Sequence, residues 1–531
     1  MSLMNNETKQ MLRSPMFVLV AVVMGWIVVA FLVMPTVQLL LTVFAPDPAA
    51  GMGPWEKLAA SNPAKRSLIN SFVLAAVLSV TVNVVGVFIV LVTRYFDVKG
   101  GEILWLGYAT TLIYGGIVLV AGYKFLYGSN GFLTKSLLMV IPGLDPEWFS
   151  GALAVIFVMT FATTGNHLLF LSSAMAKVDY QTVEAARQMG ASTTRILWSV
   201  VLPVLKPTLF AITILTFLGG LSALAAPQIL GGRDFQTITP MILTFANTPT
   251  SRDLAAALAI ILAAATMLML FVMNRLESGG TYFSVSKVPV ALVKEKITNP
   301  VTNVLVHAAA YALFLVYALP PALIVLFSFT NAESIAFARL SADSFTLDNY
   351  VKVLTDPNAS WPFLVSIGYS AVAAIVVIVL LLFTARIITR YRNKVTAGLE
   401  YLLHIPWVMP STMTALSLIV AYDHPNPLVA GYVLTGTVII LGIAYVIGKI
   451  PFTLRMLKAA FTGIPNNLEE AASMLGAGQF YTFRRVLLPL VLPAATAITA
   501  LNFNSMLDDY DTAVFLAHPF YQPLGVFIKN A

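Results

Sequence analysis

Long apolar runs are the feature of this chain that most constrains its fold. A helix needs roughly 20 consecutive, mostly apolar residues to cross a lipid bilayer. Eleven stretches of about that length follow one another along the 531 residues. The sequence therefore predicts an all-α polytopic membrane protein. The predicted spans lie at about residues 17–40, 71–92, 103–122, 152–171, 209–226, 254–276, 308–329, 364–383, 401–422, 429–447 and 490–507.

Composition supports this class and excludes others. Hydrophobic residues make up 58% of the chain and charged residues only 10%, which is typical of polytopic membrane proteins. The absence of cysteine excludes disulfides and thiolate metal sites. The net charge of +7 does not indicate a nucleic-acid partner, because the basic residues are not clustered with aromatic residues on a soluble face.

The placement of lysine and arginine predicts the orientation. With the N-terminus in the cytoplasm, 21 of the 31 basic residues fall in cytoplasmic segments. Cytoplasmic loops of membrane proteins carry an excess of lysine and arginine. The opposite orientation would place the dense basic clusters outside, so we expect a cytoplasmic N-terminus.

An internal repeat divides the chain. The string "EAARQMGA" begins at Glu184, and "EAASMLGA" begins at Glu470, 286 residues later. Such a duplication predicts two halves related by a pseudo-two-fold axis. We expect a first half at 1–276 with its repeated loop at about 178–207, a linker at 277–300, and a second half at 301–531 with its loop at about 464–493. The matched positions are Glu184, Ala185, Ala186, Gly190, Ala191, Val200, Leu202, Pro203 and Pro207 with Glu470, Ala471, Ala472, Gly476, Ala477, Val486, Leu488, Pro489 and Pro493.

Each half should hold six spans, but the second half has five. The first half ends in a sixth apolar run, whereas the chain stops at Ala531 before an equivalent run. We therefore expect the natural chain to extend further, or its end to be disordered.

The repeated loop predicts a docking element on the cytoplasmic side. Residues of about 182–189 and 468–475 favour helix, and each run ends at a glycine suited to a helix C-terminus. A helix of two or three turns is not stable alone in water. It must pack on another surface. Paired alanines allow a close approach, and the glutamate adds a directional charge.

The pattern E-A-A, three residues, G and a downstream L-P resembles the signature loop of permease subunits of bacterial binding-protein-dependent ABC importers. The second copy, "PFTLRMLKAAFTGIPNNLEEAASMLGAGQFYTFRRVLLPLVLP", is the more similar, and the whole chain resembles the fused, two-half permeases of the type I class. The resemblance implies docking on two copies of an ATPase subunit that carry ATP and magnesium. It also implies an external solute-binding protein or lipoprotein, and a bacterial plasma membrane. The implied docking residues are Glu184, Ala185, Ala186, Gly190, Glu470, Ala471, Ala472 and Gly476.

The chain itself shows no sign of an enzyme. Its nearest string to a phosphate-binding loop, "GIAYVIGKI" at 442–450, has the wrong spacing and lies in a predicted span. The five histidines lack metal-ligand spacing. We therefore expect no catalytic residues, no metal site and no cofactor in this chain.

The solute is the least constrained prediction. "ALAAPQILGG" at 223–232 resembles the ferric iron branch of the family, and Asp508, Asp509 and Asp511 follow the eleventh span. Acidic side chains at a pathway mouth attract cations within about 10 Å. We therefore expect ferric iron. The same class could carry a phosphonate, a sugar phosphate, thiamine or a polyamine, and the acids could simply stay hydrated or meet the binding protein.

Two alternatives belong to other classes. A secondary transporter driven by an ion gradient could have duplicated halves, but it would leave the paired loops unexplained. A membrane enzyme or scaffold would need a convergent catalytic set, which the sequence does not show.

Overall fold

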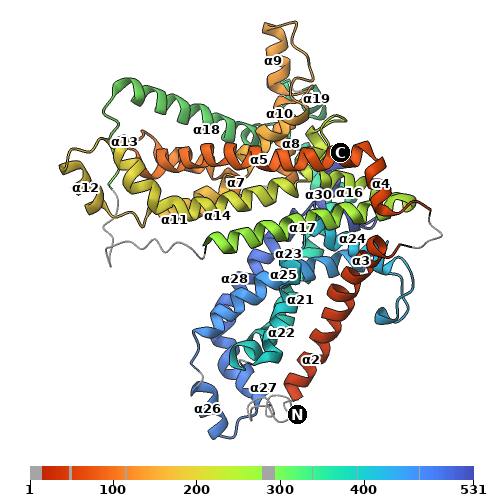
Figure 1. Cartoon of the computed structure of the whole chain (residues 1–531). Helices are drawn as coiled ribbons and strands as arrows, with labels where there is room; N and C mark the ends of the chain where they lie inside the picture. Colours follow the sequence, from red (N-terminus) through yellow and green to blue (C-terminus); the bar gives the residue numbers. More distant parts are fainter. Residues whose placement is uncertain are drawn as a thin grey trace. The chain divides into compact units, whose positions relative to one another are not determined.

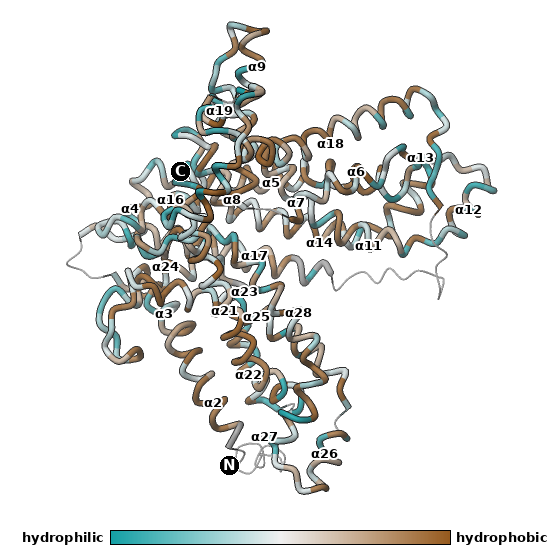
Figure 2. The backbone as a smooth tube through the Cα atoms, turned by 180° about the vertical axis from the view of Figure 1, so that it is seen from behind, coloured by the Kyte–Doolittle hydropathy of each residue, from teal (hydrophilic) through white to brown (hydrophobic). Residues whose placement is uncertain are grey.

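The computed structural model describes residues 15–46, 51–113, 116–277, 293–337, 339–391, 393–465 and 467–530. Across these ranges the chain is helical, and its extended pairings are two isolated bridges. Nine of the described helices are long and apolar enough to cross a membrane. The expected all-α, multi-pass membrane protein is thereby confirmed. Figure 2 shows the apolar character along helices such as α2 (Pro15–Ile27).

Two further spans are broken by sharp bends. When each bent pair counts as one span, the described part of the chain holds up to eleven. The helices over Gly101–Ile113 and Gly116–Val140 meet at 119°, and those over Lys394–Trp407 and Ser411–Tyr422 meet at 102°. The second break falls at Met409, whose backbone is extended. It precedes Pro410, and the proline ring disfavours helical backbone in the residue before it. Pro406 and Pro410 predict a kink in the span at 401–422, and the second bend confirms it. The sequence predicts the span at 103–122 but not the first bend.

The sequence repeat is also a structural repeat. The helices that follow the two repeated loops begin and end at positions 286 residues apart, the same offset that relates the matched letters. They are α13 (Thr193–Ile196), η5 (Leu197–Val201) and α14 (Leu202–Leu221) in the first copy, and α27 (Gln479–Thr482), η9 (Phe483–Leu487) and α28 (Leu488–Leu507) in the second.

Proline explains the wide turn in each copy. Both η5 and η9 are π-helical, and each ends one residue before a Leu-Pro pair, at Pro203 or Pro489. Proline has no backbone N–H, and its ring clashes with the carbonyl four residues earlier. A π-helical turn moves that carbonyl away, so the helix continues through the proline.

The described part of the chain forms two compact units. Unit 2 comprises Ser61–Met241 and Ala264–Asp356. Its central helix is α5 (Asn62–Val90), which begins because the Ser61 side chain accepts a hydrogen bond from the Ala64 backbone N–H. Residues four apart on one face of α5, such as Leu74, Leu78 and Val82, are fully buried. The other helices are η3 (Leu91–Tyr95), α6 (Gly101–Tyr108), α7 (Thr110–Ile113), α8 (Gly116–Tyr127), α9 (Phe132–Val140), α10 (Gly151–Ala162), η4 (His167–Leu171), α11 (Ser172–Met175), α12 (Tyr180–Gln188), α15 (Ala225–Leu230), α18 (Pro300–Ser328), α19 (Ala332–Phe337), η7 (Ala342–Ser344) and α20 (Asp348–Thr355).

Unit 1 comprises Met1–Ala60, Ile242–Ala263 and Pro357–Ala531. Its central helix is α21 (Pro357–Arg390), which packs on α25 and α28. The side chain of Asn502 on α28 donates to Thr453 Oγ1 on α25 over 2.8 Å, so this buried amide has a partner. The other helices are α2, η1 (Val28–Val33), α3 (Met34–Phe44), α4 (Pro54–Ala60), η6 (Pro249–Ser251), α22 (Lys394–Leu403), α23 (Ile405–Val408), α24 (Ser411–Tyr422), η8 (Pro427–Val429), α25 (Val438–Thr462), α26 (Asn467–Met474), α29 (Ala513–Leu516) and α30 (Leu524–Asn530); α16 (Ile238–Ala246) and α17 (Arg252–Glu277) have residues in both units.

The first helix of the second repeat, α18, packs inside unit 2. It lies on α6 and α8. The hydroxyl of Tyr108 donates to the Ala310 carbonyl over 2.8 Å, and the Tyr317 hydroxyl is hydrogen-bonded to Thr164 at 2.7 Å. Both tyrosine rings are fully buried.

The first helices of the chain, α2 to α3, pack inside unit 1. Helix α3 lies on α24, and the Tyr422 hydroxyl donates to the Ala30 carbonyl over 2.5 Å. The Trp26 indole N–H donates to the Leu428 carbonyl over 2.9 Å. The two repeats have therefore exchanged their first helices. The predicted halves at 1–276 and 301–531 follow the repeat, whereas the compact units follow the packing.

The exchange of α18 generates a stability prediction at Gly107. A Cβ atom at this position of α6 would come within 2.3 Å of the Phe314 ring on α18. We expect Gly107→Ala to destabilise the chain by about 1–3 kcal/mol, the usual cost of overpacking a core. The apparent melting temperature of the detergent-solubilised protein would report it.

The matched control is Gly448→Ala on α25, where no atom lies within 4 Å of the added Cβ. Replacing a glycine by alanine inside a helix is otherwise favourable. Equal melting temperatures for the two variants would contradict the close packing of α6 on α18.

Candidate functional site

The two repeated loops form short helices, as the sequence predicts. Helix α12 in unit 2 begins after Asp179, whose carboxylate accepts a hydrogen bond from the Gln181 backbone N–H over 3.1 Å. Helix α26 in unit 1 is of similar length. Each helix is followed by a glycine with positive φ, +84° at Gly190 and +82° at Gly476. Glycine adopts this left-handed conformation without strain, so it ends the helix cleanly.

The predicted docking residues divide between the buried and the exposed face of each helix. In α12, Ala186 is buried and belongs to the unit 2 core together with Val183, whereas Glu184 is half-buried. Ala185 and Gly190 are exposed. The structure therefore uses one alanine of the pair to attach the helix and leaves the other one accessible.

Helix α26 is attached differently. Glu470, Ala471 and Gly476 are exposed, and Ala472 is half-buried. The buried residue of this helix is Glu469, which stands one position before the repeated motif. Figure 1 shows α12 and α26 each at an end of its own helix bundle.

Sequence reasoning missed an apolar tip on each helix. Met189 is 82% exposed at the end of α12, and Met474 and Leu475 are 89% and 88% exposed at the end of α26. Met189 and Leu475 occupy equivalent positions of the repeat. These exposed apolar side chains are candidates for contact with a partner at both copies of the loop. The strings "RQMGA" and "SMLGA" carry the signal, because an apolar residue directly precedes each helix-ending glycine.

Ion pairs hold both helices. In unit 2, Arg187 lies 3.4 Å from Glu184 on the same helix and also pairs with Glu295. In unit 1, Glu469 pairs with Arg386 at 2.8 Å and with Arg390. The side chains of Glu295 and Glu469 are almost fully buried, at 8% and 6% exposed. Buried carboxylates of this kind need a cationic partner.

The three acids after α28 have different surroundings. Asp509 Oδ2 accepts hydrogen bonds from the backbone N–H groups of Thr512 and Ala513, over 3.2 and 3.3 Å, at the start of α29. Asp509 therefore has a local structural role. Asp508 and Asp511 are half-buried. Burial, followed by the nearby charges of Asp509 and Asp508, raises the pKa of Asp511 to about 7.

The raised pKa of Asp511 generates a pH prediction. Between the ordinary pKa of 3.8 and about 7, the folded protein holds a proton that the unfolded chain has released. Stability should therefore fall as pH rises through this window. We expect Asp511→Asn to raise the apparent melting temperature at pH 8 and to leave it unchanged at pH 4. The gain should not exceed a few kcal/mol, because one pKa unit corresponds to about 1.4 kcal/mol.

The control for this comparison is Asp234→Asn, at an exposed position of unit 2. It should leave the melting temperature unaltered at both pH values. If the wild type and Asp511→Asn differ in melting temperature by the same amount at pH 4 and at pH 8, the pKa of Asp511 is not raised and the prediction is wrong.

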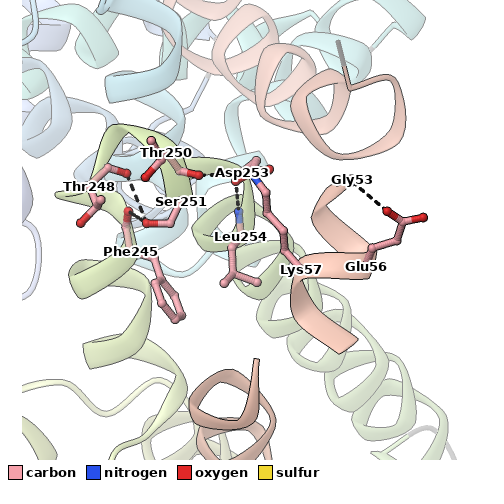
Figure 3. Close-up of polar contacts among 9 residues, drawn as sticks. All are labelled: Gly53, Glu56, Lys57, Phe245, Thr248, Thr250, Ser251, Asp253 and Leu254. Carbon is pink, nitrogen blue, oxygen red and sulfur yellow. Dashed lines mark hydrogen bonds and ion pairs between the residues drawn. The ribbon is translucent and has the colours of Figure 1, made fainter. Parts of the chain in front are cut away.

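A polar cluster ties the start of α17 to α4 within unit 1. Figure 3 shows Lys57 reaching the Thr250 carbonyl at 3.2 Å and the Asp253 carboxylate at 2.7 Å. The neighbouring Arg252 pairs with Asp423 at 2.5 Å, next to the end of α24. These contacts hold the start of α17 to α4 and to the end of α24.

A wide, open groove in unit 1 lies between the first helix and α21 and α25. Its volume is about 900 Å³, and its lining is apolar, with Trp26, Phe31 and Tyr369 among the larger side chains. No charged residue lines it. Among the residues that the structure describes, no group of three His, Asp or Glu side chains converges as a metal site.

Known proteins resemble this chain over most of its length. The family model described as "Binding-protein-dependent transport system inner membrane component" matches residues 308–530. A probable ABC transporter permease protein, y4fN of Sinorhizobium fredii, is 40% identical over 96% of this chain and 89% of the relative. The ferric transport system permease protein FbpB of Actinobacillus pleuropneumoniae is 21% identical over 94% of this chain and 72% of the relative.

A partial match involves the sulfate transport system permease protein CysT of Salmonella typhimurium. It is 31% identical over 32% of this chain and 62% of the relative. All these relatives are permease components, in keeping with the repeated loops and the membrane spans. The chain therefore belongs to the permeases of binding-protein-dependent ABC transporters.

Proposed function

We propose that this chain is the translocation subunit of an ATP-driven importer in a bacterial plasma membrane, with its N-terminus in the cytoplasm. An external binding protein delivers the solute, and two copies of a separate ATPase subunit supply ATP and magnesium. The observation that carries the proposal is the pair of short helices, α12 and α26, with an exposed apolar tip at equivalent positions. One ATPase copy docks on each.

The chain geometry provides a path for motion from each docking helix into the membrane. After Gly190 the chain re-enters a continuous helical span over Thr193–Leu221, and after Gly476 it enters the corresponding span over Gln479–Leu507. Two residues separate each glycine from its span. A displacement of α12 or α26 is therefore passed directly to a membrane helix. Closure of the ATPase pair on ATP would move both spans together.

Docking can be tested at the apolar tips and the motif glutamates. We expect Met189→Asp and Glu470→Lys each to weaken ATPase binding by roughly 5- to 30-fold, which corresponds to about 1–2 kcal/mol. Asp at 189 would place a charge in a tip that loses its water on docking. Lys at 470 would reverse the charge that the helix presents to the ATPase. Copurification of the ATPase with the tagged permease, and binding to the permease in nanodiscs, would measure the loss.

The control is Met52→Asp, where the methionine is 53% exposed in the segment between the first two spans, on the side of the membrane opposite to the N-terminus. It should leave ATPase binding intact. Full ATPase binding and full transport in both Met189→Asp and Glu470→Lys would contradict the docking role of α12 and α26.

For the solute we propose ferric iron. The support is that FbpB, a ferric permease by its name, aligns with 94% of this chain, whereas the sulfate permease CysT aligns with 32%. Asp508 and Asp511 add acidic groups beyond the end of the α28 span. Asp509 contributes less to this argument than the sequence suggests, because its carboxylate already caps α29.

The solute is tested with the permease, its ATPase and its binding protein reconstituted in proteoliposomes. We expect the iron-loaded binding protein to stimulate ATP hydrolysis, and Asp508→Asn with Asp511→Asn to slow uptake of radiolabelled iron. Binding of the binding protein should be unchanged in that double variant. Stimulation by a sulfate- or phosphonate-loaded protein and none by the iron-loaded form would reject the iron assignment and leave the importer assignment standing.

A further inference from the structure

The two docking helices are fixed to their bundles by ion pairs of opposite polarity. On α12 the cation is on the docking helix, at Arg187, and the anion is Glu295. On α26 the anion is on the docking helix, at Glu469, and the cations are Arg386 and Arg390. We propose that these pairs set the position of each docking helix independently, and that Glu295 is a positioning residue for α12. This inference rests on the proposed function of the two helices.

Glu295 belongs to the segment that joins the two repeats. The sequence predicts this segment, 277–300, as a simple polar linker. The structure shows that its end is attached to unit 2 by backbone hydrogen bonds. The Glu295 N–H donates to the Tyr95 carbonyl, and the Asp97 N–H donates to the Glu295 carbonyl, both over 2.8 Å. The backbone of Glu295 is therefore fixed beside the end of η3.

The side chain of Glu295 is directed from this fixed backbone to α12. It is 8% exposed, whereas its partner Arg187 is 43% exposed. A carboxylate buried to this degree is stable only while it is paired, because an isolated charge loses its hydration. Arg187 also contacts Glu184, the first residue of the repeated motif. Arg187 thus connects Glu295 of the linker with Glu184 of the repeated motif.

Unit 1 achieves the same attachment with other residues. Arg386 and Arg390 lie one turn apart near the C-terminal end of α21. The negative end of the helix dipole stabilises cations there. Their side chains surround Glu469 of α26, and the Arg386 and Glu469 side chains are 5% and 6% exposed. A cavity of about 80 Å³ beside them is also lined by Phe17 and Thr482.

The repeat shows that the two arrangements are not copies of each other. The position equivalent to Glu469 in the first copy is Val183, which is fully buried in the unit 2 core. The position equivalent to Arg187 in the second copy is Ser473. Each copy therefore lacks the charged residue that the other one uses. Loss of one pair should release one docking helix and leave the other in place.

A crossed labelling experiment tests this half-specific control. The chain has no native cysteine, so Met189→Cys and Leu475→Cys each give a single labelling site at equivalent, exposed positions. The full chain is spin-labelled in nanodiscs without ATPase. We expect Glu295→Gln to shift the spectrum of the label at 189 toward the mobile component and to leave the label at 475 unchanged. Glu469→Gln should do the reverse.

A charge swap separates positioning from general folding. We expect Arg187→Gln to reproduce the effect of Glu295→Gln, and the double variant Arg187→Glu with Glu295→Arg to restore the immobile spectrum at 189. Because Arg187→Gln leaves the buried Glu295 carboxylate unpaired, the melting temperature of each variant is measured beside its spectrum as the control for folding. Equal mobility at both sites in every variant, or no rescue by the swap, would overturn the proposal.

Addition of the ATPase gives a second readout. In the reconstituted complex, Glu295→Gln should reduce substrate-stimulated ATP hydrolysis, and the charge swap should recover it. If the label at 189 becomes mobile but ATPase binding and hydrolysis are unchanged, the ion pair positions α12 as inferred and the docking function of α12 is wrong. If the spectra are unchanged while ATPase binding is lost, the positioning role is wrong and the docking function stands.

Discussion

Backbone hydrogen bonding inside the bilayer is the constraint on which the rest of this structure depends. The bilayer core supplies no water, so each span has to pair its own N–H and C=O groups. Proline breaks that pairing, and the backbone responds differently at different prolines. At Pro203 and Pro489 a π-helical turn lets the helix continue, whereas at Pro410 the helix stops and restarts at 102° to its former direction. The spans that follow α12 and α26 are thus continuous.

The two repeats keep their backbone in register while their side chains diverge. The helices that follow α12 and α26 begin and end at positions 286 residues apart, and their prolines have the same offset. The buried contacts of α12 and α26 do not agree. One copy uses Val183 and the core of unit 2, and the other uses Glu469 and two arginines. The two copies therefore share the bounds of their helices but differ in the side chains that attach α12 and α26 to the rest of the unit.

Much of this was predictable from local patterns in the sequence. The repeated glycines at 190 and 476 mark the helix ends because positive φ is a local property, and the apolar runs locate the spans for the same reason. The kink beside Pro410 was predictable in the same way, because proline acts on the residue before it. The exchanged first helices and the burial of Glu469 rather than Glu470 depend on contacts between distant segments. Asp509 shows the same limit, because the sequence places it at the end of a span but does not reveal that it caps α29.

The exchange of first helices has a consequence for biosynthesis. Helices α2 and α3 are made first, yet the helices on which they pack, α21 and α24, belong to the second repeat. They must wait in the bilayer, without their native neighbours, until most of the chain has been inserted. Because both repeats belong to one polypeptide, the same ribosome makes α2, α3 and the helices on which they pack, in equal numbers. Separate halves would have to find each other by diffusion in the membrane.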